Sequence, residues 1–442
     1  MKRFTGIFLA LLIPGLLLAG GCSKSPEEKR EAYLRSAQSY MEKEKYAEAA
    51  IEFQNALQIA PDDAQTLVTL GEIQLKMMKA SDAYKAFSRA VGIDPRNTKA
   101  HEYLTSIQLL ARKYDLAEKQ ASIILEYEPE NRKAQEMLAQ ALFQSGKQKE
   151  AVAIMDGLLK DPKPLEATII NAVQMYMATG RVEDALALLS SGSSLYPESS
   201  KIRFLASDIY AFKDDIKRAR EWAEDAYRVE GDNINAGIAL ARFYAGHRMD
   251  DLFTALISEL KAKFPNDPSP YLLESGIMQQ KGNLDQAIAL AETARKIEDT
   301  TAAKTVIAQL LLEKGDPSGA QKILAETLEK DPNAVTSRVM LARIYLQQDN
   351  PQKALDTLDT LIKSIPQRPD VAVPTAQAYL MKGDLQKARD LVEKSLQEYK
   401  DNPALHGTMA KVHFMEGKFR EALSEVTLLA DNSAATPDIM YI

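Results

Sequence analysis

The sequence predicts an all-α protein in which one helical hairpin is repeated along nearly the whole chain. Two observations carry this prediction: alanine recurs with a period of 34 residues, and no segment alternates with period two for long enough to form a strand. Counting from Ala49 in steps of 34, with one step of 33, twelve positions fall in register and eleven of them are alanine. Two helices per repeat give about 24 helices. The register positions are Ala49, Ala83, Ala117, Ala151, Ala185, Ala219, Phe253, Ala287, Ala320, Ala354, Ala388 and Ala422.

The first repeat, residues 33–61, shows how each unit is built. Its predicted first helix carries Tyr33, Ala37 and Tyr40, and its predicted second helix carries Ala49, Phe53 and Ala56. Spacings of three and four place each set on one face of its helix. The small residues allow close approach of the two helices, and Pro61 ends the second because proline lacks an N–H for the helical ladder.

The later repeats keep this pattern through residues 30–434, which we assign to the solenoid. A glycine often stands where the paired helices turn, and we expect it to adopt the left-handed conformation that ends many helices. These glycines are Gly146, Gly180, Gly282, Gly315, Gly383 and Gly417.

The N-terminus is a candidate export signal. Lys2 and Arg3 precede an apolar stretch over residues 7–18, and small residues then lead to Cys22, the only cysteine of the chain. One cysteine excludes an intramolecular disulfide. An uncleaved anchor helix is the alternative, which Pro14 in mid-segment disfavours.

This N-terminal pattern resembles a bacterial lipoprotein signal. The resemblance implies that residues 1–21 are a signal peptide, that Cys22 is lipidated, and that residues 22–29 are a short tether. Ser23 stands where many lipoproteins of the inner membrane carry aspartate, so the resemblance implies the periplasmic face of the outer membrane. At the other end, Pro437 follows a threonine in a helix-start pattern, so we expect residues 435–442 to begin a further repeat or to form a short cap.

Charge and motif content argue against several functions. The 55 basic and 62 acidic residues give a net charge of −7, which is unlike a nucleic-acid-binding protein. No HExxH, Walker or GxGxxG motif is present. His406 and His413 are seven residues apart, a poor spacing for a metal site on one helix, so we expect the histidines at the surface or in a groove. We therefore predict no catalytic residue, no metal, no cofactor and no small-molecule substrate.

The offsets of Ala49, Phe53, Ala56 and Pro61 resemble the second helix and exit turn of the tetratricopeptide (TPR) family. The resemblance implies a right-handed superhelix whose concave groove is lined by positions 2, 5, 9 and 12 of each repeat. We predict that a protein partner binds the groove of the fifth to seventh repeats, because apolar residues there flank an amide, an acid and an arginine. Packing of Ile170 and Phe204 between repeats is the alternative. The predicted groove residues are Ile170, Gln174, Met177, Phe204, Asp208, Phe212, Ile238 and Arg242.

The lipoprotein-like signal followed directly by such repeats is similar to the TPR lipoproteins of PEP-CTERM/exosortase and exopolysaccharide export systems. This similarity implies a lipid-anchored scaffold for protein–protein interactions in the cell envelope. Two alternatives remain: an assembly factor for the outer membrane or a secretion machinery, and the non-catalytic part of a longer envelope enzyme.

Overall fold

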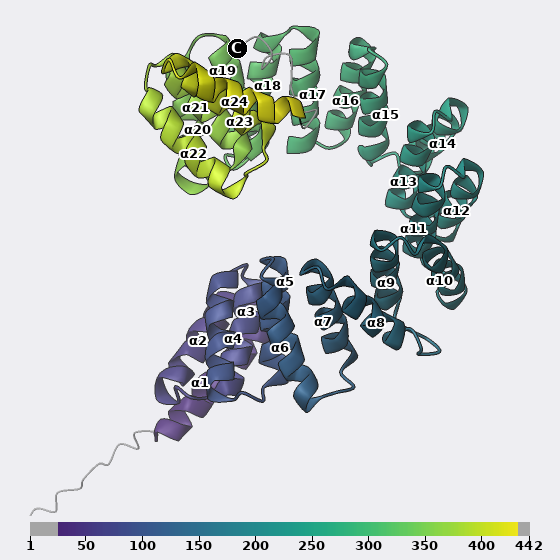
Figure 1. The fold of residues 1–442 in the computed structure, drawn as a ribbon, viewed down its shortest axis with the longest axis vertical. Coiled ribbons are helices and arrows are strands. Elements are labelled where there is room, and N and C mark those ends of the chain that lie inside the picture. Colours follow the sequence, from purple (N-terminus) through teal and green to yellow (C-terminus); the bar gives the residue numbers. More distant parts are fainter. Residues whose placement is uncertain (1–24, 432–442) are drawn as a thin grey trace, which may run out of the picture. The chain divides into compact units, whose positions relative to one another are not determined.

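A computed structural model describes residues 25–431, and within this range it contains helices and no strands (Figure 1). The predicted signal peptide, Cys22 and residues 435–442 lie outside the described residues. The predicted all-α repeat fold is confirmed. The helices are α1 (Pro26–Glu42), α2 (Tyr46–Ile59), α3 (Ala64–Lys76), α4 (Ala80–Ile93), α5 (Thr98–Leu110), α6 (Tyr114–Tyr127), α7 (Arg132–Gln144), α8 (Gln148–Leu158), α9 (Glu166–Ala178), α10 (Val182–Leu195), α11 (Ser200–Phe212), α12 (Ile216–Val229), α13 (Ile234–Gly246), α14 (Asp250–Lys263), α15 (Ser269–Gln280), α16 (Leu284–Ile297), α17 (Thr301–Lys314), α18 (Pro317–Lys330), α19 (Val335–Gln347), α20 (Pro351–Ser364), α21 (Pro369–Met381), α22 (Leu385–Glu398), α23 (Pro403–Met415) and α24 (Phe419–Asp431).

The chain divides into two units, and the boundary in the sequence lies between Lys213 and Asp214. Unit 1 contains α1–α11, and unit 2 contains α12–α24. Within each unit, an odd-numbered first helix packs against the even-numbered second helix that follows it, and that hairpin packs against the next (Figure 1). First helices also contact each other directly, as α19, α21 and α23 do. Stacking within each unit is consistent with the right-handed superhelix that the resemblance implies.

Burial of the alanine series confirms the predicted register. The eleven alanines are between 0% and 4% exposed, so each lies where two helices cross closely. Phe253 replaces alanine in the seventh repeat and is 3% exposed, and its larger ring occupies the crossing of α13 and α14. Leu260, near the C-terminal end of α14, faces Gly237 of α13. A β-carbon at Gly237 would lie 2.4 Å from Leu260 Cδ2. Any larger residue at position 237 would therefore force the buried Leu260 side chain to shift.

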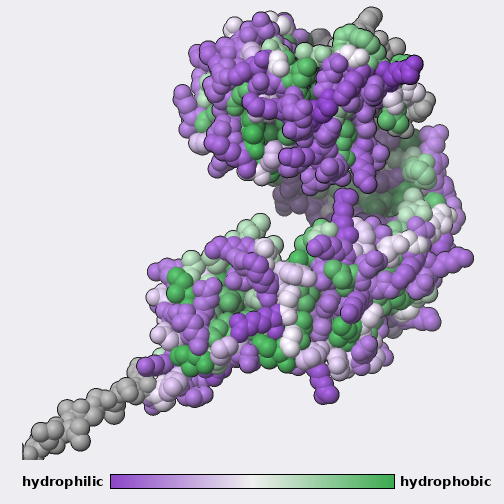
Figure 2. All heavy atoms as spheres, turned by 60° about the vertical axis from the view of Figure 1, so that its left-hand side comes forward, coloured by the Kyte–Doolittle hydropathy of each residue, from purple (hydrophilic) through white to green (hydrophobic). Residues whose placement is uncertain are grey.

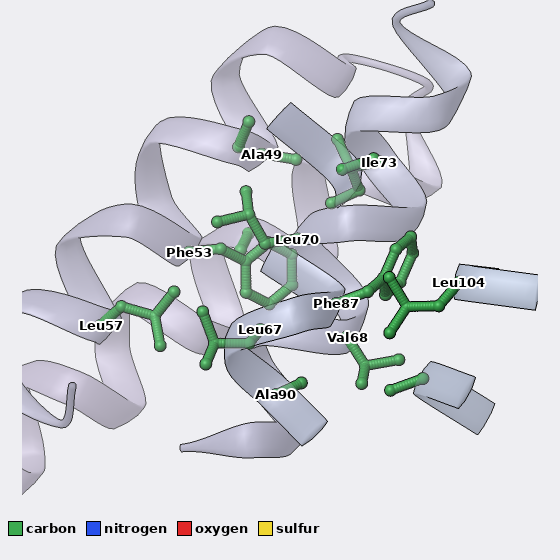
Figure 3. Close-up of a cluster of buried hydrophobic side chains, with 14 residues drawn as sticks. Ala49, Phe53, Leu57, Leu67, Val68, Leu70, Ile73, Phe87, Ala90 and Leu104 are labelled. Carbon is green, nitrogen blue, oxygen red and sulfur yellow. The ribbon is translucent and has the colours of Figure 1, made fainter. Parts of the chain in front are cut away.

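Figure 3 shows how the first three repeats share one apolar core. Phe53 of α2, Leu67 and Leu70 of α3, and Phe87 of α4 are all buried in it. The Phe87 ring stacks on Tyr103 of α5, with ring centroids 4.6 Å apart and nearly parallel planes. Each repeat thus completes its core with side chains of the next repeat, which is why a solenoid is stabilised by neighbours rather than by one central core.

The turn between paired helices takes the left-handed conformation in every repeat. The six predicted glycines have φ between 75° and 88°, which confirms their role. The other six repeats place a non-glycine residue at the same position, with φ between 55° and 61°. The sequence did not single out these six because their side chains carry no common chemical feature. They are Glu44, Met78, Arg112, Asp214, Arg248 and Asp349.

The tether is shorter than predicted. Helix α1 begins at Pro26, so residues 26–29 belong to the first repeat rather than to a flexible linker. The Ser25 hydroxyl accepts a hydrogen bond from the Glu28 N–H, and the Glu28 carboxylate accepts one from the Ser25 N–H. This capping box, with a proline at the first helical position, starts the helix four residues before residue 30.

Candidate protein-binding surfaces

Helix α9 presents two distinct faces. Ile169, Ala172, Val173 and Tyr176 are buried against neighbouring helices. The predicted groove residues lie on the other face, where Gln174 is exposed and Ile170 and Met177 are partly exposed. The spacing of three and four residues separates the faces, so the side chains of the second set are available to a partner.

Helix α11 holds three more of the predicted residues. Ile202, Ala206 and Ile209 form its buried face, whereas Phe204 is partly exposed and Phe212 is 76% exposed. The Asp208 carboxyl reaches the surface, but the surrounding protein partly desolvates it and raises its pKa above the usual range. A cation from a partner would offset this desolvation, so α11 offers aromatic contact area beside an acid.

The last two predicted residues, Ile238 and Arg242, are on α13 in unit 2. They line a depression of about 380 Å³ between α13 and α15, together with Leu272 and Ile277. Arg242 is exposed and has no carboxylate within ion-pair distance among residues 25–431. The predicted groove therefore consists of six residues in unit 1 and two in unit 2, and each part is placed within its own unit.

A second groove, which we did not predict, lies on the first helices of the last three repeats in unit 2. It has a volume of about 440 Å³ and is lined mainly by apolar side chains. Its sequence signal was present, because large apolar residues recur there at intervals of 34 residues. We call it the C-terminal groove. Its lining residues are Leu346, Gln377, Leu380, Met381, Lys411, Phe414 and Met415.

A third depression, of about 560 Å³, lies on α2, α3 and α4. Its rim is charged, but those charges already have partners within unit 1: Lys85 lies 3.4 Å from Asp82, and Arg89 donates to the Pro61 carbonyl. Elsewhere, hydrophobic side chains reach the surface in small patches among hydrophilic ones (Figure 2). The depression beside Ile238 and the C-terminal groove differ from this third depression, because each is lined by a cation without an ion-pair partner in residues 25–431, Arg242 in the first and Lys411 in the second.

The histidines correct one expectation. His101 is 4% exposed rather than at the surface or in a groove, because its ring bridges two elements. Its Nδ1 lies 2.5 Å from Gln120 Oε1 of α6, and its Nε2 lies 3.0 Å from the Pro95 carbonyl oxygen. His406 repeats this geometry nine repeats later: Nδ1 is 2.5 Å from Glu425 Oε2 of α24, and Nε2 is 2.6 Å from the Lys400 carbonyl oxygen. Both rings act as clamps between a second helix and the preceding loop.

The two clamps differ in their need for a proton. Both partners of His406 are acceptors, so only the doubly protonated imidazolium can donate to both. Burial lowers the pKa of His406, but the hydrogen bonds to Glu425 and the Lys400 carbonyl, with the charges of Glu425 and Asp401, raise it above its ordinary value. The Gln120 amide, in contrast, can turn to donate its N–H, so a neutral ring satisfies His101.

We therefore expect the last hairpin to lose stability as pH rises. A raised pKa in the folded state means that the stabilisation is complete below the unfolded value of about 6.5 and is lost as pH rises through the folded pKa. Amide protection of α24, corrected for intrinsic exchange, should fall over that range. His406→Gln should abolish this dependence, and His101→Gln should leave it in place. Unchanged protection of α24 across the range would contradict the prediction.

Two further features bear on the kind of site. Across residues 25–431, three or more His, Cys, Asp or Glu side chains nowhere gather in a way that could hold a metal ion. In the same range, every helix is too short or too polar to cross a bilayer.

The repeat family is shown by sequence comparison. Models of the tetratricopeptide repeat match residues 31–63, 108–166, 311–378 and 379–439, which together make up half of the chain. The chain belongs to the tetratricopeptide repeat proteins, a fold typical of scaffolds for protein–protein interaction. No curated protein matches the sequence at a significant level.

Solved structures with a similar arrangement include yeast Tom70, at 16% identity and a TM-score of 0.43, with 93% of each chain covered. The Cut9–Hcn1 hetero-tetramer of the APC/C matches at 10% identity and a TM-score of 0.42, covering 93% of this chain and 95% of that one. A tetratricopeptide repeat protein from Parabacteroides merdae matches at 14% identity and a TM-score of 0.42, covering 64% of this chain and 99% of the chain of that protein. At these identities and scores, the similarities bear on neither partner nor mechanism.

Proposed function

We propose that this protein is a lipid-anchored scaffold of the bacterial cell envelope, located at the periplasmic face of the outer membrane. Its repeats recruit other envelope proteins by binding segments of them. One observation carries the proposal: first helices in both units present apolar and charged side chains at the surface. Phe212 of α11 is exposed, and Arg242 of α13 is exposed and has no ion-pair partner in residues 25–431. Such combinations suit protein segments.

The anchor and the process served are the finer parts of the proposal. The basic start, the apolar stretch and the small residues before Cys22 support lipidation at that cysteine. The similarity of this signal, followed by repeats, to the lipoproteins of PEP-CTERM/exosortase systems supports a role in exopolysaccharide or PEP-CTERM protein export.

Replacement of Cys22 tests the anchor. Cys22→Ser should abolish labelling with palmitate and leave an unprocessed chain, because the thiol is the atom that carries the lipid. The measurement is metabolic labelling followed by fractionation of the envelope. Ser23→Ala, one residue further on, should label as the parent does. Equal labelling of the Cys22→Ser protein would refute lipidation at this position.

In-cell crosslinking tests the scaffold role. A photoreactive residue at Gln174, exposed on α9, should give discrete crosslinked products with other envelope proteins. The same residue at Glu126, exposed on the second helix α6, serves as the matched control and should give few. Equal, diffuse crosslinking from both positions would count against a binding face on the first helices.

A further inference from the structure

Two lines of side chains follow the C-terminal groove across α19, α21 and α23. Arg343, Gln377 and Lys411 form a polar line at intervals of 34 residues. One helical turn further along each helix, Leu346, Leu380 and Phe414 form an apolar line. Met381 and Met415 continue the apolar line on two of the three helices.

The apolar line is partly open to solvent: Leu346 is partly exposed, whereas Leu380 is 7% exposed and packs in the core. Met381 is 44%, Phe414 47% and Met415 50% exposed, although large apolar side chains are normally buried. The Phe414 ring meets the Phe419 ring edge to face at 5.5 Å, which holds it in place beside the groove. Methionine side chains are flexible and adapt to varied apolar surfaces, so this face can accept a partner without rearrangement of the helices.

The charge of the groove is one-sided. Lys411 lines it, and Arg343 is exposed on the same face of α19. Neither cation has a carboxylate within ion-pair distance among residues 25–431, and no carboxylate lines the groove. Glu416, which follows α23, is already paired with Arg389 and with Lys418. The groove thus combines an apolar floor with one unpaired positive charge in its lining, Lys411, and a second, Arg343, on the adjoining surface of α19.

We propose that the C-terminal groove binds an extended segment of another protein that alternates large apolar residues with acidic ones. This inference rests on the proposed scaffold function and names the chemistry of one recruited segment. Charge complementarity excludes a second copy of this groove as the occupant, because two copies would oppose cation to cation. Acidic side chains of the segment would pair with Lys411 and Arg343.

The spacing of the helices sets the period of the segment. Packed helices lie about 8–10 Å apart. A polyproline II segment advances about 3.1 Å per residue and completes a turn in about three residues, roughly 9 Å. A large apolar residue at every third position therefore meets Leu346, Met381 and Phe414 in succession. An acidic residue between them reaches the polar line.

A pair of labelled peptides tests the inference on the full-length protein in nanodiscs of neutral phosphatidylcholine. One peptide repeats Leu-Pro-Glu four times, and its twin repeats Leu-Pro-Lys. By fluorescence anisotropy, the acidic peptide should bind at least about tenfold more tightly, and the difference should shrink as salt is added. Equal binding of the two peptides, or tighter binding of the basic one, would overturn the proposal.

Variants locate the binding. Phe414→Ser with Met415→Ser should weaken binding of the acidic peptide at least about tenfold, because both side chains lose apolar contact area. Lys411→Glu should abolish the preference for the acidic peptide, because the new carboxylate offsets the remaining charge of Arg343. Leu110→Ser, at the corresponding helix end of α5 and 86% exposed, should change neither. If the groove variants retain their helicity and bind as the parent does, the proposal fails. The crosslinking result at Gln174 in unit 1 is independent of this outcome, so the two proposals can fail separately.

Discussion

Ala117→Leu should lower the free energy of unfolding by about 1–3 kcal/mol, because the larger side chain overpacks a helix crossing. Ala117 lies on α6, is fully buried, and belongs to the alanine series that stands at the crossing of paired helices. Three additional carbon atoms have no space there unless α5 and α6 move apart. Thermal unfolding followed by circular dichroism measures the effect as a lower midpoint.

Glu126→Leu on the same helix provides the matched control. Glu126 is exposed, and surface substitutions away from special features usually change stability by less than about 0.5 kcal/mol. The two variants introduce the same side chain on one helix, so they differ only in the face that receives it. Equal destabilisation by both would mean that the series does not mark the crossings and that the assigned register is wrong.

The register was predictable because the packing constraint repeats. A crossing of two helices admits only a small side chain, so Ala49 and its successors are visible as a 34-residue period. The left-handed turns were only half predictable. Glycine marks six of them, but at Met78 and Arg112 the surrounding repeat imposes the conformation on residues that do not favour it.

The binding surfaces were less predictable than the fold, for a physical reason. The position of a residue in a repeat fixes which face it occupies, and Gln174 and Arg242 are at the surface as expected. Whether a charged side chain is already paired depends on side chains of the neighbouring repeat, about 30 residues away in the sequence. Glu72, for example, is exposed by position, yet it pairs with Lys99 at 2.6 Å and accepts a hydrogen bond from Tyr103 at 2.9 Å. Sequence position alone therefore could not separate the paired charges from Arg343 and Lys411, which have no partners in the described residues.

The largest effect on binding is expected from Phe204→Ala combined with Arg242→Ala. Binding energy concentrates in a few aromatic and arginine anchors that cost about 2 kcal/mol or more each when truncated, so losing two should weaken capture of the main partner on the order of a hundredfold or more. Phe204 is partly exposed beside a buried face formed by Ile202 and Ala206, and Arg242 is exposed. Truncation of either therefore leaves the buried face of its helix intact, and the melting midpoint should stay close to that of the parent. Quantitative co-purification from crosslinked cells measures the loss.

Tyr84→Ala with Arg35→Ala is the matched control, since it removes one exposed aromatic ring and one exposed arginine from outside the groove positions. Gln140→Ala, an exposed groove position on α7, should also be tolerated, whereas Glu72 is unsuitable because its pairs with Lys99 and Tyr103 would be lost. If the double variant at Phe204 and Arg242 unfolds, Phe204 supports packing between repeats instead of binding. If the protein stays folded and still captures its partner at parental levels, the partner binds another surface, and the C-terminal groove, with its exposed Phe414 and unpaired Lys411, is the next to test.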